Sequence, residues 1–420
     1  MHVAVLGAGV AGIATAYFLR EAGHQVTVVD RQNAAALETS YANAGHVCPS
    51  YATPWAAPGM RYKAAKWSAQ AWLGMDTALK FTPRLDRHQW RWLKRFWGEC
   101  DAEHYVVNKA RMGRIGRYSH AQLKTLRERL GLDYEQTTGG NLQVFRDATG
   151  LANAQIVVKV LSDAGVPHKL MSVEECLAFD PALVPSRDQI VGGLLMPADE
   201  TGNCQLFTTR LARWLQDNGV TFHYSTAIHG LSAPGDSVSV QLASGPLAAD
   251  AYVLSCAYPS AALARPLGLD LPIYPVKGYA ITVPITNDAL APKSGIMDEA
   301  LKVAITRMGN KVRAAGTAEI GARDTAVTKA DCATTIRSVA TLFAGGVDMD
   351  RAEYWAGLRP MTPDGAPLIG KTRYRNLFLA TGGGSNGWTT ACGVGRTTAD
   401  IISGKTPEID VSDLGLDRFQ

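Results

Sequence analysis

The sequence lacks the residue patterns that mark disulfide-bonded and metal-binding proteins. It has seven cysteines, an odd number, and the closest two, Cys176 and Cys204, are 28 positions apart, so no C-x-x-C motif occurs. The nine histidines form no H-E-x-x-H pattern and no other cluster with the spacing of metal ligands. We therefore expect a protein with reduced thiols and no metal.

Long apolar runs and a strong excess of one charge are absent too. The longest uncharged stretch near the C-terminus, residues 376–395, is rich in glycine and polar residues and predicts no membrane-spanning helix. The formal net charge of +4 is too small by itself to indicate nucleic acid binding. The first apolar run begins at Val3, which leaves no room for a cleaved signal, so we expect a cytoplasmic protein.

What is present begins with the pattern of a dinucleotide-binding turn. An apolar run, residues 3–6, leads into Gly7, Gly9 and Gly12, and Asp30 closes the next apolar run 18 positions after the third glycine. Such glycines permit a tight bend, the close approach of a pyrophosphate and the packing of helix on strand, while the acid binds an adenosine ribose and repels a 2′-phosphate. The alternative is a glycine-rich turn in another kind of α/β protein. We expect cofactor contacts from Gly7, Ala8, Gly9, Val10, Ala11, Gly12, Asp30 and Arg31.

A second glycine-rich turn, residues 382–387, follows a strand pattern and opens a helix pattern. A nicotinamide dehydrogenase does not need a second turn of this kind. A flavin gains negative charge near its pyrimidine edge on reduction, and free N–H groups at a helix N-terminus stabilise that charge. The alternative is a turn that only packs strand against helix. We predict flavin contacts from Gly382, Gly383, Gly384, Ser385, Asn386 and Gly387.

The length of 420 residues favours two domains. Helix patterns cover residues 10–22, 151–164 and 200–218, and the region from residue 273 is rich in strand patterns. We expect an α/β plus antiparallel β fold, with a Rossmann-like FAD-binding domain of the glutathione-reductase type and a substrate domain on an antiparallel sheet. The expected FAD-binding domain comprises residues 1–57, 145–272 and 345–420, and the substrate domain residues 58–144 and 273–344.

Several long segments resemble the D-amino acid dehydrogenases of the small-subunit type, within the FAD-dependent oxidoreductases that include glycine oxidase and sarcosine oxidase. The resemblance is carried by the first turn, ETGNCQLFT at 200–208, PVKGYAITVPI at 275–285, YWAGLRPMTPDGAPLIG at 354–370 and NGWTTACGVG at 386–395. It implies noncovalent FAD, oxidation of the Cα–N bond of a D-amino acid, and delivery of electrons to a membrane quinone rather than to oxygen. Gly383 departs from the resemblance, which leads us to expect a histidine there.

Arg359 is the candidate anchor for a substrate carboxylate. A planar guanidinium holds a carboxylate bidentately, which a lysine cannot do, and Pro360 restricts the preceding backbone. In the resembling oxidases the arginine of this motif is the anchor. The alternative is an ordinary ion pair, for example with Glu353 or Asp364.

Three further side chains are weaker catalytic candidates. Tyr279 is either a second donor to the substrate or a packing residue of a strand. Tyr51 and His46 follow the first βαβ unit and either approach the flavin ring or have a local structural role. The same loop is expected to cover the pyrophosphate or the flavin with Ser40, Asn43, Ala44 and Gly45.

The resulting hypothesis is hydride transfer from Cα of the neutral-amine substrate to flavin N5. The imino acid is then hydrolysed to a 2-oxo acid and ammonia. No protein acid or base is strictly needed, because the amine lone pair drives the expulsion of the hydride. The alternatives are a flavin oxidase of glycine, sarcosine or a cyclic imino acid, which produces hydrogen peroxide, and a flavoprotein that serves only as a binding subunit.

Residues 61–100 contain five of the nine tryptophans and many more Lys and Arg than Asp and Glu. Tryptophan beside basic residues favours a membrane interface with anionic headgroups, which suits electron transfer to a lipid-dissolved quinone. We therefore expect peripheral contact with the cytoplasmic face of the inner membrane. Amphipathic helices that pack on the protein's own core with solvated charges explain the same pattern. Nothing in the sequence fixes an oligomeric state.

Overall fold

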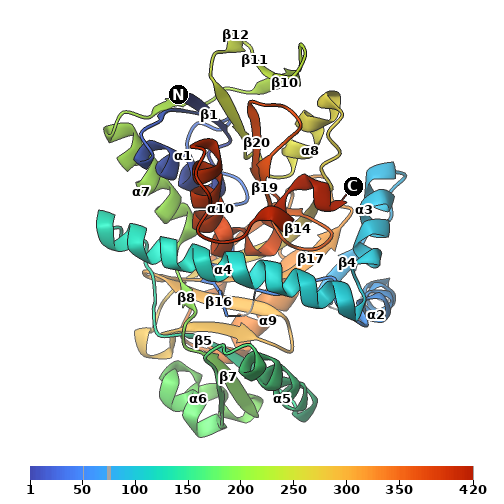
Figure 1. The fold of residues 1–420 in the computed structure, drawn as a ribbon. Coiled ribbons are helices and arrows are strands. Elements are labelled where there is room, and N and C mark those ends of the chain that lie inside the picture. The colour runs from blue at the N-terminus through green and yellow to red at the C-terminus, as the bar shows by residue number, and fades with distance from the viewer. Residues whose placement is uncertain (51, 73–76, 420) are drawn as a thin grey trace.

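The computed structural model describes residues 1–50, 52–72 and 77–419. Figure 1 shows a six-stranded sheet in the upper half of the molecule and a larger, nine-stranded sheet below it. The six-stranded sheet has the order β19-β20-β13-β1-β2-β9, and only β19 runs antiparallel to its neighbour. Its strands are β1 (His2–Leu6), β2 (Gln25–Val29), β9 (Thr221–His223), β13 (Ala251–Leu254), β19 (Leu368–Lys371) and β20 (Leu377–Thr381).

The central strand β1 is buried on both faces, which explains its continuous apolar run. Val3 and Val5 pack into the core formed with the helices, whereas Ala4 and Leu6 pack with Val240 of a small antiparallel sheet. The small sheet contains β10 (Ile228–Ser232), β11 (Ser239–Leu242) and β12 (Gly245–Leu247). The helices of this half are α1 (Val10–Glu21), α4 (Ala102–Leu130), α7 (Cys204–Asp217), α8 (Pro259–Ala264) and α10 (Gly387–Ile402).

The nine-stranded sheet has the order β18-β14-β17-β16-β15-β5-β7-β6, and β4 adds to β17. Helix α9 (Ala333–Leu342) packs on one face through Val339 and Leu342, which share a core with Ile281 and Ile305. The strands are β4 (Leu79–Phe81), β5 (Asn141–Phe145), β6 (Lys169–Met171), β7 (Gly192–Met196), β14 (Tyr274–Pro284), β15 (Gly295–Asp298), β16 (Val303–Met308), β17 (Lys311–Ile320) and β18 (Glu353–Met361). Helices α5 (Ala148–Asp163) and α6 (Val173–Phe179) lie at its far end (Figure 1).

The strand pairing differs from the expected division of the chain. β6, β7 and β18 lie in segments that we assigned to the FAD-binding domain, yet all three are hydrogen-bonded into the nine-stranded sheet. Strand patterns in the sequence carry no information about which distant strand they pair with, and the domain bounds at residues 145 and 345 stay a prediction. The expected fold class, a parallel sheet with an antiparallel-sheet partner, is confirmed.

The tryptophan-rich stretch folds as α2 (Met60–Trp72), β4 and α3 (Arg87–Gly98). Asp86 caps α3 by accepting the His88 N–H at 2.9 Å, and the helix buries Trp92 and Phe96 against the large sheet while Trp90 stays exposed. The interpretation that amphipathic helices pack on the protein's own core therefore fits Trp92. Within the described ranges no helix is both long and apolar enough to cross a bilayer.

Candidate active site

A cavity of about 880 Å³ lies between the two sheets. The turns that follow β1, β13 and β20 line one side, and β14, β17 and β18 line the other. The carboxyl ends of parallel strands are where ligands bind in open α/β sheets. The site is therefore built where the two halves of the molecule meet.

The first glycine turn makes contacts that only glycine permits. Gly7 has φ of +114°, and a Cβ there would lie 2.5 Å from the Ser255 carbonyl oxygen. A Cβ at Gly12 would lie 2.0 Å from the Gly7 carbonyl oxygen, so α1 can pack directly on the turn. Gly9 has no atom nearer its Cβ position than Ser40 Oγ at 3.5 Å, and it lines the cavity with the start of α1.

Asp30, at the end of β2, supports this turn. Its Oδ2 accepts the Ala8 N–H at 2.6 Å and its Oδ1 accepts the Gln32 N–H at 2.8 Å. Burial raises the pKa of Asp30, because desolvation outweighs these hydrogen bonds. Arg31 forms a bidentate ion pair with Glu38, at 2.6 and 2.8 Å. Neither Asp30 nor Arg31 lines the cavity, so their cofactor contacts stay predictions.

The loop from Ser40 to Gly45 is held against the cavity by its own hydrogen bonds. Ser40 Oγ accepts the Val10 N–H at 3.1 Å, and Asn43 Oδ1 accepts the Gly45 N–H at 2.9 Å. The Thr306 hydroxyl donates to the carbonyl of Ala44 at 2.7 Å. The four predicted loop residues Ser40, Asn43, Ala44 and Gly45 all line the cavity.

His46 follows in the two-residue strand β3 (His46–Val47), which pairs with β8 (Glu200–Thr201). Its Nε2 donates to the Ile305 carbonyl at 3.4 Å, and the side chain lines the cavity. Burial lowers the pKa of His46 to about 4, so the ring is neutral at pH 7. The other candidate of this loop, Tyr51, lies outside the described residues.

Helix α10 directs its N-terminus into the same cavity. Residues 382–387 all line it, and the helix has neither a side-chain cap nor an acidic residue in its first turn. A Cβ at Gly395 would lie 2.7 Å from the Ala14 carbonyl carbon, so α10 crosses α1 at close range. Two positively polarised helix ends therefore reach one cavity with no carboxylate in either first turn.

Arg359 lies on β18, the edge strand of the large sheet, where Pro360 is tolerated. The guanidinium lies against Gly278 of β14 and 5.9 Å from the centre of the Trp55 ring. No ion pair or hydrogen bond to this guanidinium occurs among the described residues, and both carboxylates proposed as alternative partners are paired elsewhere. Burial lowers the pKa of Arg359 to about 10, so it stays protonated at neutral pH.

Tyr279 lines the cavity, but its hydroxyl is bonded within the protein. The side chain is 1% exposed, packs in the core on the α9 side of the sheet, and donates its hydroxyl proton to Glu319. Burial, followed by this carboxylate, raises the pKa of Tyr279. The hydroxyl therefore has no proton free for a substrate. The packing interpretation fits this environment.

The sequence analysis missed several cavity residues. Gly278 could have been suspected, because an isolated glycine in a strand pattern signals a close approach. Thr317 gave no signal in the sequence. It is the extra residue of a β-bulge next to the Gly278–Ala318 pair, with φ of +43° and a buried hydroxyl that no residue in the described ranges contacts by a hydrogen bond. Trp355 was overlooked too, and its ring folds over Gly357, where a Cβ would lie 2.1 Å from Cη2.

A family model described as FAD dependent oxidoreductase matches residues 2–401. The chain belongs to this family. FAD is therefore the cofactor of this FAD-dependent oxidoreductase. The prediction of a flavin from the two glycine turns is confirmed.

Named relatives of this oxidoreductase cover its full length. Proteins of Agrobacterium fabrum and Methylobacterium radiotolerans, both named D-amino acid dehydrogenase, are each 48% identical over 421 residues, which is 100% of both chains in each comparison. The crystal structure of glycine oxidase from Geobacillus kaustophilus is similar with a TM-score of 0.75 and 21% identity, over 99% of this chain and 97% of that one. The latter shows the shared fold.

The cavity suits the chemical groups of FAD. A pyrophosphate is an anion that fits the N-terminus of α1, where Gly9 leaves space and Ser40 borders it. The N-terminus of α10 stabilises negative charge at the second turn, where a flavin becomes anionic on reduction. Arg359 also lines this cavity. It is a cation separate from the two helix N-termini, because it lies on the opposite sheet.

Proposed function

We propose that this chain oxidises D-amino acids to 2-oxo acids and ammonia. The observation that carries the proposal is the Arg359 guanidinium, which has no partner among the described residues and is desolvated in the wall of a cofactor cavity. A buried cation without a protein counter-ion is costly, and a substrate carboxylate supplies the missing charge bidentately. The names of the relatives at 48% identity support a D-amino acid as that substrate.

FAD, when bound, accepts the hydride that leaves the substrate Cα. Arg359 holds the carboxylate and so fixes the orientation of Cα toward the cofactor. The neutral His46 ring contributes no charge beside the reaction centre. No side chain has to remove the Cα hydrogen as a proton, so the binding and orientation of the substrate determine the rate. Water then hydrolyses the imino acid.

The remaining site residues act as cofactor contacts in this proposal. The N-terminus of α1 holds the pyrophosphate, the ribose binds on the side of the turn that Asp30 supports, and the turn before α10 holds the flavin. Support comes from the shared cavity lining of both turns. Tyr279 takes no part, because its hydroxyl is bonded to Glu319.

The test is anaerobic mixing of the purified holoenzyme with D-amino acids, L-amino acids, glycine and sarcosine, while flavin absorbance is recorded. We expect D-amino acids to bleach the flavin. Arg359→Ala should raise the substrate concentration for half-maximal bleaching at least 10-fold, whereas the exposed Arg375→Ala should not change it. Bleaching by glycine or sarcosine alone, with stoichiometric hydrogen peroxide in air, would identify the oxidase alternative instead.

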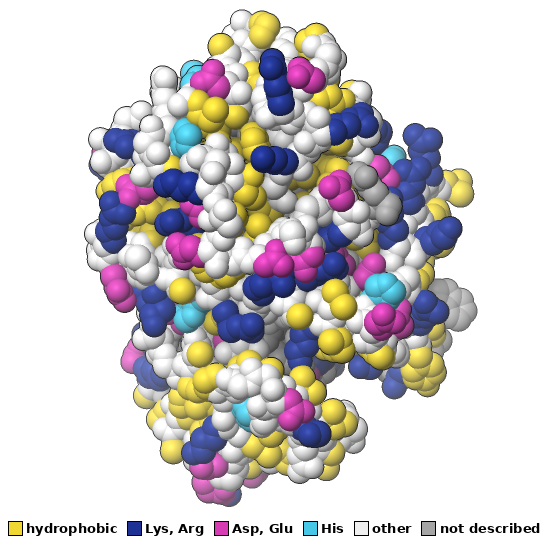
Figure 2. Space-filling view, in the orientation of Figure 1, with side chains coloured by type: hydrophobic (Ala, Val, Ile, Leu, Met, Phe, Trp, Pro, Cys, Tyr) yellow, Lys and Arg dark blue, Asp and Glu magenta, His cyan; other side chains and the backbone are white. Residues whose placement is uncertain are grey.

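We also propose that the electrons pass to a quinone at a membrane surface. Support comes from the exposed side of α2, α3 and the start of α4, where Tyr62, Leu85, Trp90 and Val106 are exposed. Figure 2 shows Lys and Arg side chains at the edge of the molecule where Figure 1 places α3. Apolar side chains among basic ones suit an anionic lipid surface. The basic members are Arg61, Lys63, Lys66, Arg87, Arg91 and Lys94.

Flotation with lipid vesicles tests the surface contact. We expect the protein to float with vesicles that contain anionic lipid and to stay behind with zwitterionic ones. The triple variant Tyr62→Ser, Leu85→Ser, Trp90→Ser should lose flotation, and Val184→Ser, an exposed apolar control on another surface, should keep it. Flotation of the triple variant at the wild-type level would exclude this face. Reduction of a soluble quinone analogue by substrate-bleached enzyme tests the acceptor.

A further inference from the structure

The part of the cavity beside Arg359 is apolar. Cross-strand partners in a sheet share a face, and Arg359 lies opposite Val276, while Gly278 lies opposite Ala318. Ile320, opposite Val276, continues the same face. The floor next to the guanidinium therefore consists of aliphatic side chains, with the small Ala318 nearest to Gly278.

Aromatic rings form the walls above this floor. Trp92 and Phe96 of α3 stack with centroids 5.1 Å apart, and both belong to the core cluster that contains Ala318. Trp55 joins this cluster to the anchor, because its ring also faces the Arg359 guanidinium. We call this space the aromatic compartment; its lining residues are Trp55, Phe81, Trp92, Phe96, Trp97 and Ala318.

Two polar groups that border the compartment are bonded within the protein. The Trp92 indole N–H donates to the Met361 carbonyl at 2.8 Å, and Arg61 donates to the Trp97 carbonyl at 2.5 Å. The acidic side chains that line the cavity, in the part of the chain that the structure describes, are Asp199 and Glu299, which lie beyond β17 toward β15 and β8. A cationic substrate side chain would find no carboxylate partner in this compartment among the described residues.

We propose that the aromatic compartment selects D-amino acids with large apolar or aromatic side chains, such as D-phenylalanine and D-leucine, over D-alanine and cationic ones. This inference rests on the function proposed above. With the carboxylate on Arg359, the adjoining compartment receives the side chain, and burial of a phenyl ring favours binding by on the order of 10- to 100-fold over a methyl group.

Two unreactive acids test the selection by binding alone. Propanoate and 3-phenylpropanoate correspond to D-alanine and D-phenylalanine without the amine, and titration calorimetry on the oxidised holoenzyme measures their affinities. We expect 3-phenylpropanoate to bind at least 10-fold more tightly. Ala318→Leu, which fills the compartment, should remove that advantage and leave propanoate within about threefold of wild type. Arg359→Ala should weaken both acids.

Flavin retention shows whether each variant is folded, and Ala318→Val is a smaller change in the same place. Equal affinities for the two acids, or an unchanged preference in both Ala318 variants, would overturn the selection by the compartment. The anaerobic bleaching assay distinguishes a failure of the selection from a failure of the proposed function. Bleaching by D-alanine as fast as by D-phenylalanine contradicts only the selection, whereas no bleaching by any D-amino acid contradicts the proposed function itself.

Discussion

The guanidinium of Arg359 lies directly on the backbone of Gly278 in the neighbouring strand. A Cβ at Gly278 would fall 2.4 Å from Cζ and 2.7 Å from Nη1. Because Gly278 has no side chain, the Arg359 guanidinium can lie flat against the sheet, with its N–H groups available to the cavity. Position 278 accordingly controls the orientation of the anchor without touching the substrate itself.

We expect Gly278→Ala to displace the guanidinium and to raise KM for the amino acid by about 10- to 100-fold, the value of a charge-assisted hydrogen-bonded contact. The effect should fall on KM more than on kcat, because the carboxylate is held in both ground and transition states. Steady-state kinetics with an artificial electron acceptor measure it. Gly230→Ala is the control, since no heavy atom lies within 4 Å of its Cβ position. A wild-type KM for Gly278→Ala would contradict the assignment.

Thr317 carries backbone strain at the bulge of β17. A β-branched residue at φ of +43° costs roughly 1–3 kcal/mol, and no described residue bonds to its buried hydroxyl. We expect Thr317→Gly to raise the free energy of unfolding by about 1 kcal/mol, seen as a higher midpoint in thermal unfolding. Thr317→Val keeps the branched Cβ and removes only the hydroxyl. Equal stabilisation by both variants would assign the cost to the hydroxyl instead.

Asp199 is 1% exposed, and its Oδ2 has no hydrogen-bond partner within the described part of the chain. Burial raises its pKa to about 6. Because the folded-state pKa lies above that of the unfolded chain, the native protein binds the proton more tightly. The stability contribution of this group therefore falls as the pH rises from about 4 to 6, and it then stays low.

Asp199→Asn removes this dependence, because the amide carries no charge. Relative to wild type, the variant should gain about 2–3 kcal/mol of stability between pH 4 and pH 7. Urea unfolding at the two pH values measures the difference. The exposed Asp217→Asn should show no such gain. An equal offset between variant and wild type at both pH values would contradict the assignment.

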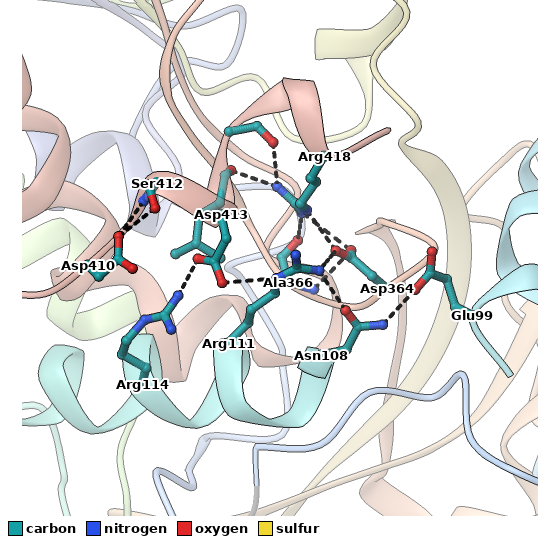
Figure 3. A network of polar contacts seen from close by, with 12 residues as sticks. Glu99, Asn108, Arg111, Arg114, Asp364, Ala366, Asp410, Ser412, Asp413 and Arg418 are labelled. Carbon is teal, nitrogen blue, oxygen red and sulfur yellow. Dashed lines mark hydrogen bonds and ion pairs between the residues drawn. The ribbon is translucent and has the colours of Figure 1, made fainter. Parts of the chain in front are cut away.

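The C-terminal segment is tied to the loop that follows β18 (Figure 3). Arg418, whose side chain is 4% exposed, donates to Asp364 Oδ2 at 2.7 Å and to the Ala366 carbonyl at 2.8 Å. From α4, Arg111 approaches the same carboxylate at 4.0 Å and bonds to Asp413. The network joins the end of the chain to the Arg359 motif.

Arg418→Ala leaves the buried Asp364 carboxylate without its main partner. We expect a loss of about 3–5 kcal/mol of stability, measured by urea unfolding of the holoenzyme. The matched control is Arg375→Ala, which breaks an exposed ion pair with Asp236 and should cost no more than about 1 kcal/mol. A similar loss of stability in both variants would show that the buried network contributes no more than an exposed ion pair.

The locally encoded features of this protein could be predicted from the sequence. The helix expected from Val10 and the helix expected from Trp388 onward, after the second glycine turn, are both confirmed. Each follows a strand and a glycine turn, and such turns depend on the φ angles and close contacts of a few consecutive residues. The flavin followed from the same two turns, because helix ends are positively polarised wherever the helix lies.

Tertiary structure decided which distant residues meet. The sequence determined that Arg359 is a planar cation and that Gly278 lacks a side chain, but only the pairing of β14 with β18 lays one on the other. It likewise brought the Tyr279 hydroxyl to Glu319, because the face on which a strand residue points depends on strand register and not on residue type. Backbone conformation is encoded within a few residues, whereas strand register results from the packing of the whole chain.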